Sequence, residues 1–496
     1  MSESAATTHV AINPDRPVGK LDRHVFGGFV EHLGRCVYGG IYDEGSALSD
    51  DHGFRRDVLE LLRDLRVSVL RWPGGNFVSN YHWADGIGPR EHRPPRPELA
   101  WGGADTNRFG TDEYLRYCAE LGAEPFICFN MGTGTLAEAL GWVEYCNSAA
   151  DTHWADQRRA NGHAEPYGVR YWALGNEMYG EWQIGALSAE EYVAEATRWA
   201  RAIRMLDPAA KLVGCGQTGW HDWDRTVTEG LAGLIDLYSI HIYTGSGDYW
   251  TNVLQPHQAE RAIRHTASML GRAAYGRQVT PPRIAYDEWN VWYREPGGAL
   301  EERYDFADAL AVATYLNIFT RNCDWVAMAN LAQLVNAIAP VVTSPETVAV
   351  QPIYYPVLLH AQAALELAAD TYVTGPLVEA QPDGPSRWDH RVADLGPFTL
   401  IDAAATVSED RGKVAVTLVN RGEDTQRTRV ELLGVEFAGP ALLRTVTDER
   451  TTEHRPLPEV RSATLDETTE KPNGANLILD LPARSFTVVE APIRSA

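Results

Sequence analysis

The chain has 496 residues, a formal net charge of −23 and a pI near 5.1. A charge of this sign repels phosphate backbones and anionic lipid surfaces, so the composition argues against nucleic acid and membranes as partners. Residues 1–20 lack the apolar stretch of a signal peptide, and no run of about 18 apolar residues follows. We therefore expect a soluble, cytoplasmic protein.

Cysteine and tryptophan usage add to this picture. The six cysteines are scattered without a CxxC pair or a zinc-finger spacing, which predicts reduced thiols that fill core space. The chain also has 15 tryptophans, many beside Gly, Asn or Glu. Rings in such surroundings often line sugar sites, although core packing must explain many of them.

The first predicted element is a β-like run at residues 8–12, which lies in a segment, residues 1–20, that we expect to join a C-terminal β-sandwich. Between residues 21 and 372, short β-rich runs alternate with segments of helical period, such as residues 54–65 and residues 189–206 with Ser188 as a possible N-cap. This alternation predicts an α/β fold, a (β/α)8 TIM barrel. Its eight predicted strands are residues 25–31, 67–71, 125–130, 169–176, 211–215, 236–243, 283–288 and 324–330.

The sequence pattern changes after about residue 370, where Gly-Pro and Pro-Asp-Gly turn signals replace the helical period. We place a domain boundary there and assign residues 373–496 to an all-β sandwich. Its predicted strands are residues 398–401, 413–419, 427–433, 476–481 and 485–490.

Polar residues collect where the predicted barrel strands end, and these ends form the active-site face of a TIM barrel. Glu177 follows the fourth strand and Glu288 ends the seventh. Glycosidic cleavage needs one carboxylic acid that protonates the leaving oxygen and one carboxylate that attacks the anomeric carbon. A lone strand-end Glu is more often a salt-bridged or solvated carboxylate, but both of these stand beside an amide or an aromatic residue.

Other chemistries lack their usual signatures in this sequence. There is no HExxH or His-x-His pattern beside a carboxylate cluster, so we predict no metal and no cofactor. His32 and His241 are lone strand-end histidines, which are more often hydrogen-bonding residues than ligands. The Gly-rich stretches at 74–75 and 132–134 are too short for phosphate loops, and a Gly-x-Ser-x-Gly elbow is absent.

Five ordered motifs resemble those of the family 51 glycoside hydrolases, the retaining α-L-arabinofuranosidases. They are FGGFVEHLGR at 26–35, RWPGGNFV at 71–78, GTGT at 132–135, WALGNEM at 172–178 and DEWNVWY at 287–293. The likeness runs through the whole barrel and, more weakly, through the sandwich. Two stretches depart from the pattern, residues 179–182 and the loop 102–108, and both bear on leaving-group preference rather than on reaction type.

The resemblance implies a role for each matching position. Glu177 corresponds to the general acid/base and Glu288 to the nucleophile, while His241 should lie beside these carboxylates and Trp101 should wall the pocket. The residues implied to hydrogen-bond the furanose are Glu31, Arg71, Asn76, Asn176, Tyr243 and Gln351. The family is also usually hexameric and intracellular in bacteria.

We accordingly expect an exo-acting retaining enzyme that releases terminal arabinofuranosyl groups from oligo- or polysaccharides. In this mechanism Glu177 must hold its proton near neutral pH, so we expect its pKa to be raised by partial burial and by the charge of Glu288. Two alternatives remain open: another retaining glycosidase on the same barrel, such as an endo-glucanase or β-xylosidase, and a carbohydrate-binding protein without turnover.

Overall fold

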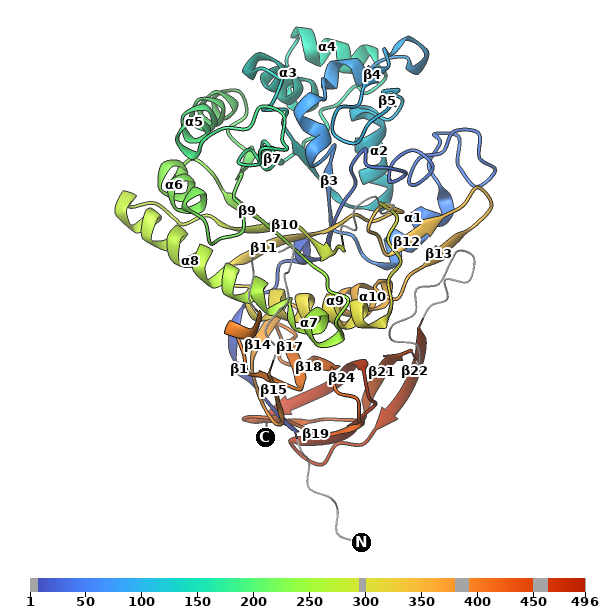
Figure 1. The fold of residues 1–496 in the computed structure, drawn as a ribbon, viewed down its shortest axis with the longest axis vertical. Coiled ribbons are helices and arrows are strands. Elements are labelled where there is room, and N and C mark those ends of the chain that lie inside the picture. Colours follow the sequence, from blue (N-terminus) through green and yellow to red (C-terminus); the bar gives the residue numbers. More distant parts are fainter. Residues whose placement is uncertain (1–7, 294–299, 380–391, 449–462, 496) are drawn as a thin grey trace.

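The computed structural model describes residues 8–293, 300–379, 392–448 and 463–495 and contains two structural units (Figure 1). The first is a closed barrel of eight parallel strands in the order β10-β11-β2-β3-β6-β7-β8-β9. Their bounds are β2 Gly27–Phe29, β3 Val69–Trp72, β6 Glu124–Cys128, β7 Tyr171–Leu174, β8 Lys211–Gly214, β9 Leu237–Thr244, β10 Arg283–Val291 and β11 Val326–Ala332. All eight predicted strands are therefore present, and the predicted TIM barrel is confirmed.

Helices surround the barrel. The α-helices are α1 Arg56–Asp64, α2 Thr111–Leu121, α3 Leu136–Asn147, α4 His153–Ala160, α5 Ala189–Leu206, α6 Asp222–Leu231, α7 Tyr249–Leu254, α8 His257–Arg277, α9 Phe306–Arg321 and α10 Tyr354–Ala363. The 3-10 helices are η1 Arg23–Phe26, η2 Asn76–Asn80, η3 Trp83–Gly86, η4 Arg90–His92 and η5 Val392–Asp394. No helix in the described ranges is long and apolar enough to cross a membrane.

Local sequence explains where two of the predicted elements begin. The hydroxyl of Ser188 accepts a hydrogen bond from the Glu191 backbone N–H, and the Glu191 side chain caps Ser188 in return, so α5 begins as predicted. The first barrel strand is shorter than predicted, because residues 23–26 form η1 instead. Asp22 caps this turn by accepting a hydrogen bond from the His24 backbone N–H.

The second unit is a ten-stranded sheet in the order β22-β21-β24-β18-β17-β14-β1-β19-β23, with β20 paired to β24. Strands from distant places in this order, such as β21 and β23, contribute side chains to one apolar core, so the sheet folds over itself as a sandwich does. Its strands are β1 Thr8–Lys20, β14 Leu367–Thr374, β17 Ile401–Val407, β18 Lys413–Asn420, β19 Gln426–Leu432, β20 Val435–Phe437, β21 Ala441–Thr447, β22 Thr464–Glu470, β23 Asn476–Leu481 and β24 Ser485–Ser495.

The N-terminal run pairs with this sheet, since β1 lies between β14 and β19. Strand β14 begins before residue 372 and pairs with β1 and β17, so we propose to draw the boundary between the units just before β14. Short two-stranded pairs complete the fold: β4 Arg96–Pro97 with β5 Ala104–Asp105, β12 Val341–Thr343 with β13 Val348–Val350, and β15 Leu377–Val378 with β16 Phe398–Thr399.

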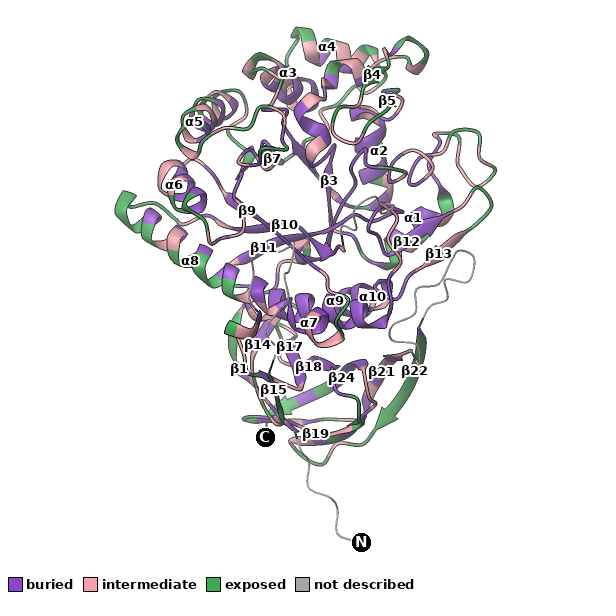
Figure 2. Cartoon of the chain, viewed as in Figure 1, coloured by how far each residue is buried: buried purple, intermediate pink, exposed green. Residues whose placement is uncertain are grey.

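Burial follows this architecture (Figure 2). Strands of the barrel are buried almost throughout, and α9 is also buried because it packs between the barrel and the sheet. The helices α5 and α8 alternate buried and exposed residues, as expected for helices with one solvent face. Strand β22 is exposed along its length at one edge of the sheet.

Candidate active site

Most of the predicted site residues meet at one end of the barrel, where the strands reach their carboxyl ends. Arg71 lies on β3, His241 and Tyr243 on β9, and Glu288 on β10. Glu177 lies three residues after the end of β7. Direct contacts, given below, connect all five, although they are far apart in the sequence.

Glu288 is held by two donors. Arg71 Nη1 donates to Glu288 Oε1 over 2.6 Å, and the Tyr243 hydroxyl donates to Oε2 over 2.9 Å. Arg71 Nη2 donates to Asn176 Oδ1 over 2.6 Å, and this contact orients the Asn176 amide. Asn176 Nδ2 is buried and has no hydrogen-bond partner among the described residues, so it leaves a donor beside the carboxylate for a ligand.

Glu177 faces the same space and is less buried. Its Oε1 contacts His241 Nδ1 and accepts from the Tyr179 hydroxyl, both over 3.1 Å, and its Oε2 accepts from Trp182 Nε1 over 3.0 Å. The Trp182 ring is 60% exposed, so this contact lies at the solvent edge of the site. Glu177 also has a φ of +43°, a left-handed conformation that is costly for a side chain with a Cβ.

His241 connects the two glutamates. Ser239, His241 and Tyr243 alternate along β9, so their side chains share the inner face of the strand. His241 Nδ1 lies 3.1 Å from Glu177 Oε1 and 3.6 Å from Glu288 Oε2. Burial lowers the pKa of His241, but the charges of Glu288 and Asp287 outweigh burial and raise this pKa to about 10. At neutral pH His241 is therefore a cation between carboxylates.

Asp287 is a site residue that the sequence analysis did not single out. Its Oδ2 lies 3.2 Å from Arg71 Nε, and its Oδ1 lies 3.2 Å from His241 Nε2 and accepts from Ser239 Oγ over 2.5 Å. In a regular strand Asp287 and Glu288 would point to opposite faces, but the register of β10 against β9 shifts between Ala285 and Glu288. Both carboxylates therefore reach Arg71. In the sequence, the pair of acidic residues at the strand end was the signal that could have pointed to Asp287.

Glu31 is buried and close enough to this cluster for the charges of Glu288 and Arg71 to act on its carboxyl group. Its Oε1 accepts hydrogen bonds from the Phe77 backbone N–H over 3.0 Å and from Trp101 Nε1 over 2.9 Å. A Cβ on Gly75 would lie 2.6 Å from Glu31 Oε2, so only glycine lets the backbone approach this closely. Burial raises the pKa of Glu31 to about 8, because the hydrogen bonds compensate only in part.

Two of the residues predicted to bind substrate have other surroundings. Asn76 is half-buried at the start of η2, and its side chain makes no hydrogen bond to any described residue. The amide of Gln351 is fully buried and binds three backbone groups: it donates to the carbonyls of Glu302 and Ala339 and accepts from the N–H of Tyr304. With both of its donors used, Gln351 holds neighbouring loops together, and its expected role in sugar binding stays a prediction.

The two glutamates are close to each other. One oxygen of Glu177, one oxygen of Glu288 and one ring nitrogen of His241 lie within 4.8 Å of one another. These ligand types could hold a divalent cation, but a ligating imidazole must be neutral, and the neighbouring carboxylates favour the protonated ring of His241. A separation of about 5 Å between two carboxylates suits direct attack on a sugar, while about 6.5–9.5 Å leaves room for a water molecule.

At the carboxyl end of the parallel barrel, two carboxylates face each other beside a buried arginine, a histidine cation and aromatic side chains. This arrangement is typical of the glycosidase class. Comparisons with known proteins agree. Residues 61–261 match the model of the α-L-arabinofuranosidase 1 domain, and residues 287–485 match that of the α-L-arabinofuranosidase C-terminal domain.

Individual relatives are similar over most of the chain. A probable α-L-arabinofuranosidase C of Aspergillus clavatus is 45% identical over 84% of this chain and 85% of its own length. An intracellular exo-α-(1→5)-L-arabinofuranosidase 1 of Bacillus subtilis is 35% identical over 86% of this chain and 87% of its own. The solved structure of the family 51 α-L-arabinofuranosidase of Thermotoga petrophila superimposes with a TM-score of 0.89 at 38% identity, covering 97% of this chain and 99% of that one. This chain belongs to the family 51 α-L-arabinofuranosidases.

Proposed function

We propose that this protein is an exo-acting retaining α-L-arabinofuranosidase in which Glu288 is the nucleophile and Glu177 is the general acid/base. The observation that carries the proposal is the approach of the two glutamates within 4.8 Å, each held by its own donors. At this separation Glu288 can attack the anomeric carbon itself, which is the retaining mechanism.

In the first step Glu288 attacks C1 while Glu177 gives its proton to the departing oxygen. Arg71 and Tyr243 hold the two oxygens of Glu288, so one lone pair can point at the sugar without a rearrangement. Although burial lowers the pKa of Arg71, Asp287 and Glu288 raise it above its ordinary value, so Arg71 remains a cation. The attacking carboxylate is thereby kept oriented beside a fixed positive charge.

The donor on Asn176 Nδ2 suits the sugar 2-hydroxyl, because a hydrogen bond there strengthens as positive charge develops at C1. In the second step Glu288 carries the sugar as an ester and has lost its charge. Glu177, now a carboxylate, takes a proton from water, and the resulting nucleophile hydrolyses the ester. Two inversions at C1 leave the released arabinose with the configuration of the substrate.

The test compares an aryl α-L-arabinofuranoside with aryl β-D-xyloside and β-D-glucoside under the same conditions. Hydrolysis of the arabinofuranoside, with the α-anomer seen first by NMR, supports the proposal. Preference for the xyloside or glucoside would favour another glycosidase on this barrel, a β-anomer would mean inversion, and no hydrolysis would favour a sugar-binding protein.

We further propose that the protein is cytoplasmic and forms a hexamer, with the sandwich serving assembly rather than sugar binding. All six cysteines are buried free thiols, which agrees with a reducing compartment, and the Bacillus subtilis relative is described as intracellular. Light scattering coupled to size-exclusion chromatography tests the hexamer, and a mass near that of one chain, 54.9 kDa, would contradict it.

A further inference from the structure

The loop that carries Trp101 has one weakly held part and one firmly held part. We define the Trp101 loop as residues 94–108, which include the paired strands β4 and β5. At its tip Leu99 is 60% exposed, and Cβ atoms built on Gly102 and Gly103 would meet nothing within 4 Å. The tip reaches the site through the hydrogen bond from Trp101 Nε1 to Glu31.

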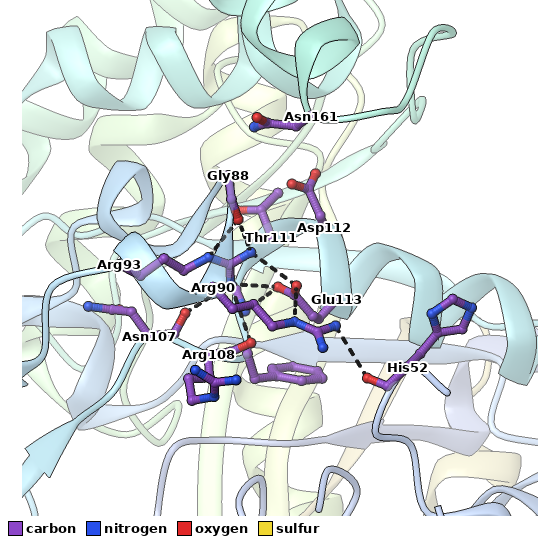
Figure 3. Close-up of polar contacts among 12 residues, drawn as sticks. His52, Gly88, Arg90, Arg93, Asn107, Arg108, Thr111, Asp112, Glu113 and Asn161 are labelled. Carbon is purple, nitrogen blue, oxygen red and sulfur yellow. Dashed lines mark hydrogen bonds and ion pairs between the residues drawn. The ribbon is translucent and has the colours of Figure 1, made fainter. Parts of the chain in front are cut away.

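The return end of this loop is anchored by Arg93 (Figure 3). Its guanidinium donates to the carbonyls of Gly88 and Asn107 and pairs with Glu113 at the start of α2. These contacts hold the chain entering and leaving the loop, and none of them involves a residue of the tip. The outgoing strand β4 has contacts of its own, a hydrogen bond from Asn80 Nδ2 to the Pro97 carbonyl and an ion pair between Arg96 and Asp85. The position between Trp101 and Asn107, on the return strand β5, is held separately.

Asp105, four residues after Trp101, occupies that position. It is buried, and its Oδ1 accepts from the Tyr38 hydroxyl over 2.7 Å and from the Asn107 backbone N–H over 3.2 Å. The same oxygen lies 3.6 Å from His32 Nδ1. His32 Nδ1 and Asp105 Oδ2 have no hydrogen-bond partner among the described residues, although both are buried.

The proton on His32 can be assigned from its other nitrogen. Trp72 Nε1 lies 3.1 Å from His32 Nε2, and an indole N–H can only donate. His32 Nε2 must therefore carry a lone pair, which puts the proton on Nδ1, facing Asp105. The imidazole is also stacked on Phe77, with ring centroids 4.4 Å apart, so its orientation is fixed.

We propose that His32 is a positioning residue, which holds Trp101 over the sugar pocket by fixing Asp105. Glu31 and His32 are consecutive residues, and they hold the same loop at two points: Glu31 at the indole of Trp101, and His32 at the base of the tip. This inference rests on the proposed function, because Trp101 is useful there as the wall of a sugar site.

A matched pair of variants tests the proposal. The amide of His32→Asn reaches the place of Nδ1 and can still donate towards Asp105, whereas that of His32→Gln reaches the place of Nε2 and can still accept from Trp72. Both variants lose the stacking on Phe77, so both should lose some thermal stability. His32→Gln should raise KM for the aryl arabinofuranoside about fivefold over His32→Asn, with kcat little changed, because Asp105 loses the donor that faces it at 3.6 Å and the loop loses part of its fixed position.

Hydrogen exchange provides a readout that does not need catalysis. Amides of residues 98–106 should exchange faster in His32→Gln than in His32→Asn. The control is His360→Gln, which changes another buried histidine, bonded to Pro356 and Asn317 between the barrel and the sheet. This control should lower stability without changing KM or exchange in the loop.

A purely structural role of His32 would give equal KM values and equal loop exchange in the Asn and Gln variants, and that result would overturn the proposal. In a Trp101→Ala background, His32→Gln should raise KM no further, and an additive rise would likewise contradict the route through Trp101. If the parent hydrolyses no arabinofuranoside, the proposed function fails, and loop exchange alone still decides the role of His32.

Discussion

Replacing Glu31 by Gln should make the stability of the protein less sensitive to pH. The side chain is 2% exposed, and burial raises its pKa from about 4.5 to about 8. Between these values the folded state keeps a proton that the unfolded state has released. The parent therefore loses stability as pH rises through this window, by about 1.4 kcal/mol per pH unit. Glutamine resembles the protonated acid in shape but cannot ionise, so this loss is absent in the variant.

The expected size of the effect follows from chain length. For 496 residues unfolding together, 1 kcal/mol corresponds to a shift in Tm of about 1 °C. The Tm of Glu31→Gln relative to the parent should therefore rise by about 4 °C between pH 5 and pH 8, and then stay constant above about pH 8. His241 also loses its stabilising proton as pH rises from about 6.5 towards 10, but it is present in both proteins and cancels in the difference.

The assay is thermal unfolding of both proteins, followed by tryptophan fluorescence in buffers from pH 5 to pH 9 at constant ionic strength. A Tm difference that is independent of pH would show that Glu31 is ionised throughout this range, and a difference that shrinks as pH rises would reverse the sign of the argument.

The remaining predictions concern catalysis directly. The Glu177→Ala variant should hydrolyse substrates with good leaving groups best, and azide should trap its glycosyl-enzyme as an arabinosyl azide of retained configuration. The Glu288→Ala variant should give the inverted azide or none. Swapped products would reverse the two roles. Trp101→Ala should weaken catalysis on arabinofuranosides while leaving the fold intact, whereas unfolding under conditions where the parent is stable would mark the ring as core. Tyr243→Phe should lower kcat/KM about tenfold or more through loss of a hydrogen bond to a carboxylate, and parent-like kinetics would contradict that contact. Prolonged EDTA treatment should leave activity intact, and a loss restored by added zinc, calcium or manganese would place a metal among Glu177, His241 and Glu288.

The barrel could be predicted because its signals are local. Each strand is a short β-rich run bounded by turn residues, and all eight runs are barrel strands in the structure. The sandwich was predicted less completely: β14, β20, β21 and β22 were missed, and the predicted run 398–401 covers β16 and only the first residue of β17. Strand β22, with the sequence TLDETTE, is exposed along its length and has no apolar face that a pattern could reveal.

Part of the candidate site could also be predicted from the sequence. Ser239, His241 and Tyr243 share one face of β9 because side chains alternate in a strand, and strand ends meet at one rim. Asp287 escaped this reasoning, because a register shift in β10 turns it towards Arg71 beside Glu288. A bulge depends on how neighbouring strands pair, and no local pattern announces it.

By itself, then, the sequence determined the barrel, the face on which chemistry occurs and the two carboxylates that stand there, because periodicity and motif order are properties of neighbouring residues. Only the tertiary structure decided which donors each carboxylate meets. Trp101 reaches Glu31 across 70 positions of the chain, and Arg71 reaches Glu288 across 217. The surroundings of Gln351 could not be predicted from the sequence for the same reason, since its backbone partners lie up to 49 residues away and occupy both of its donors. Such contacts depend on packing between distant segments. That packing also sets hydrogen-bond direction and burial, and these in turn set the pKa values of Glu31 and His241.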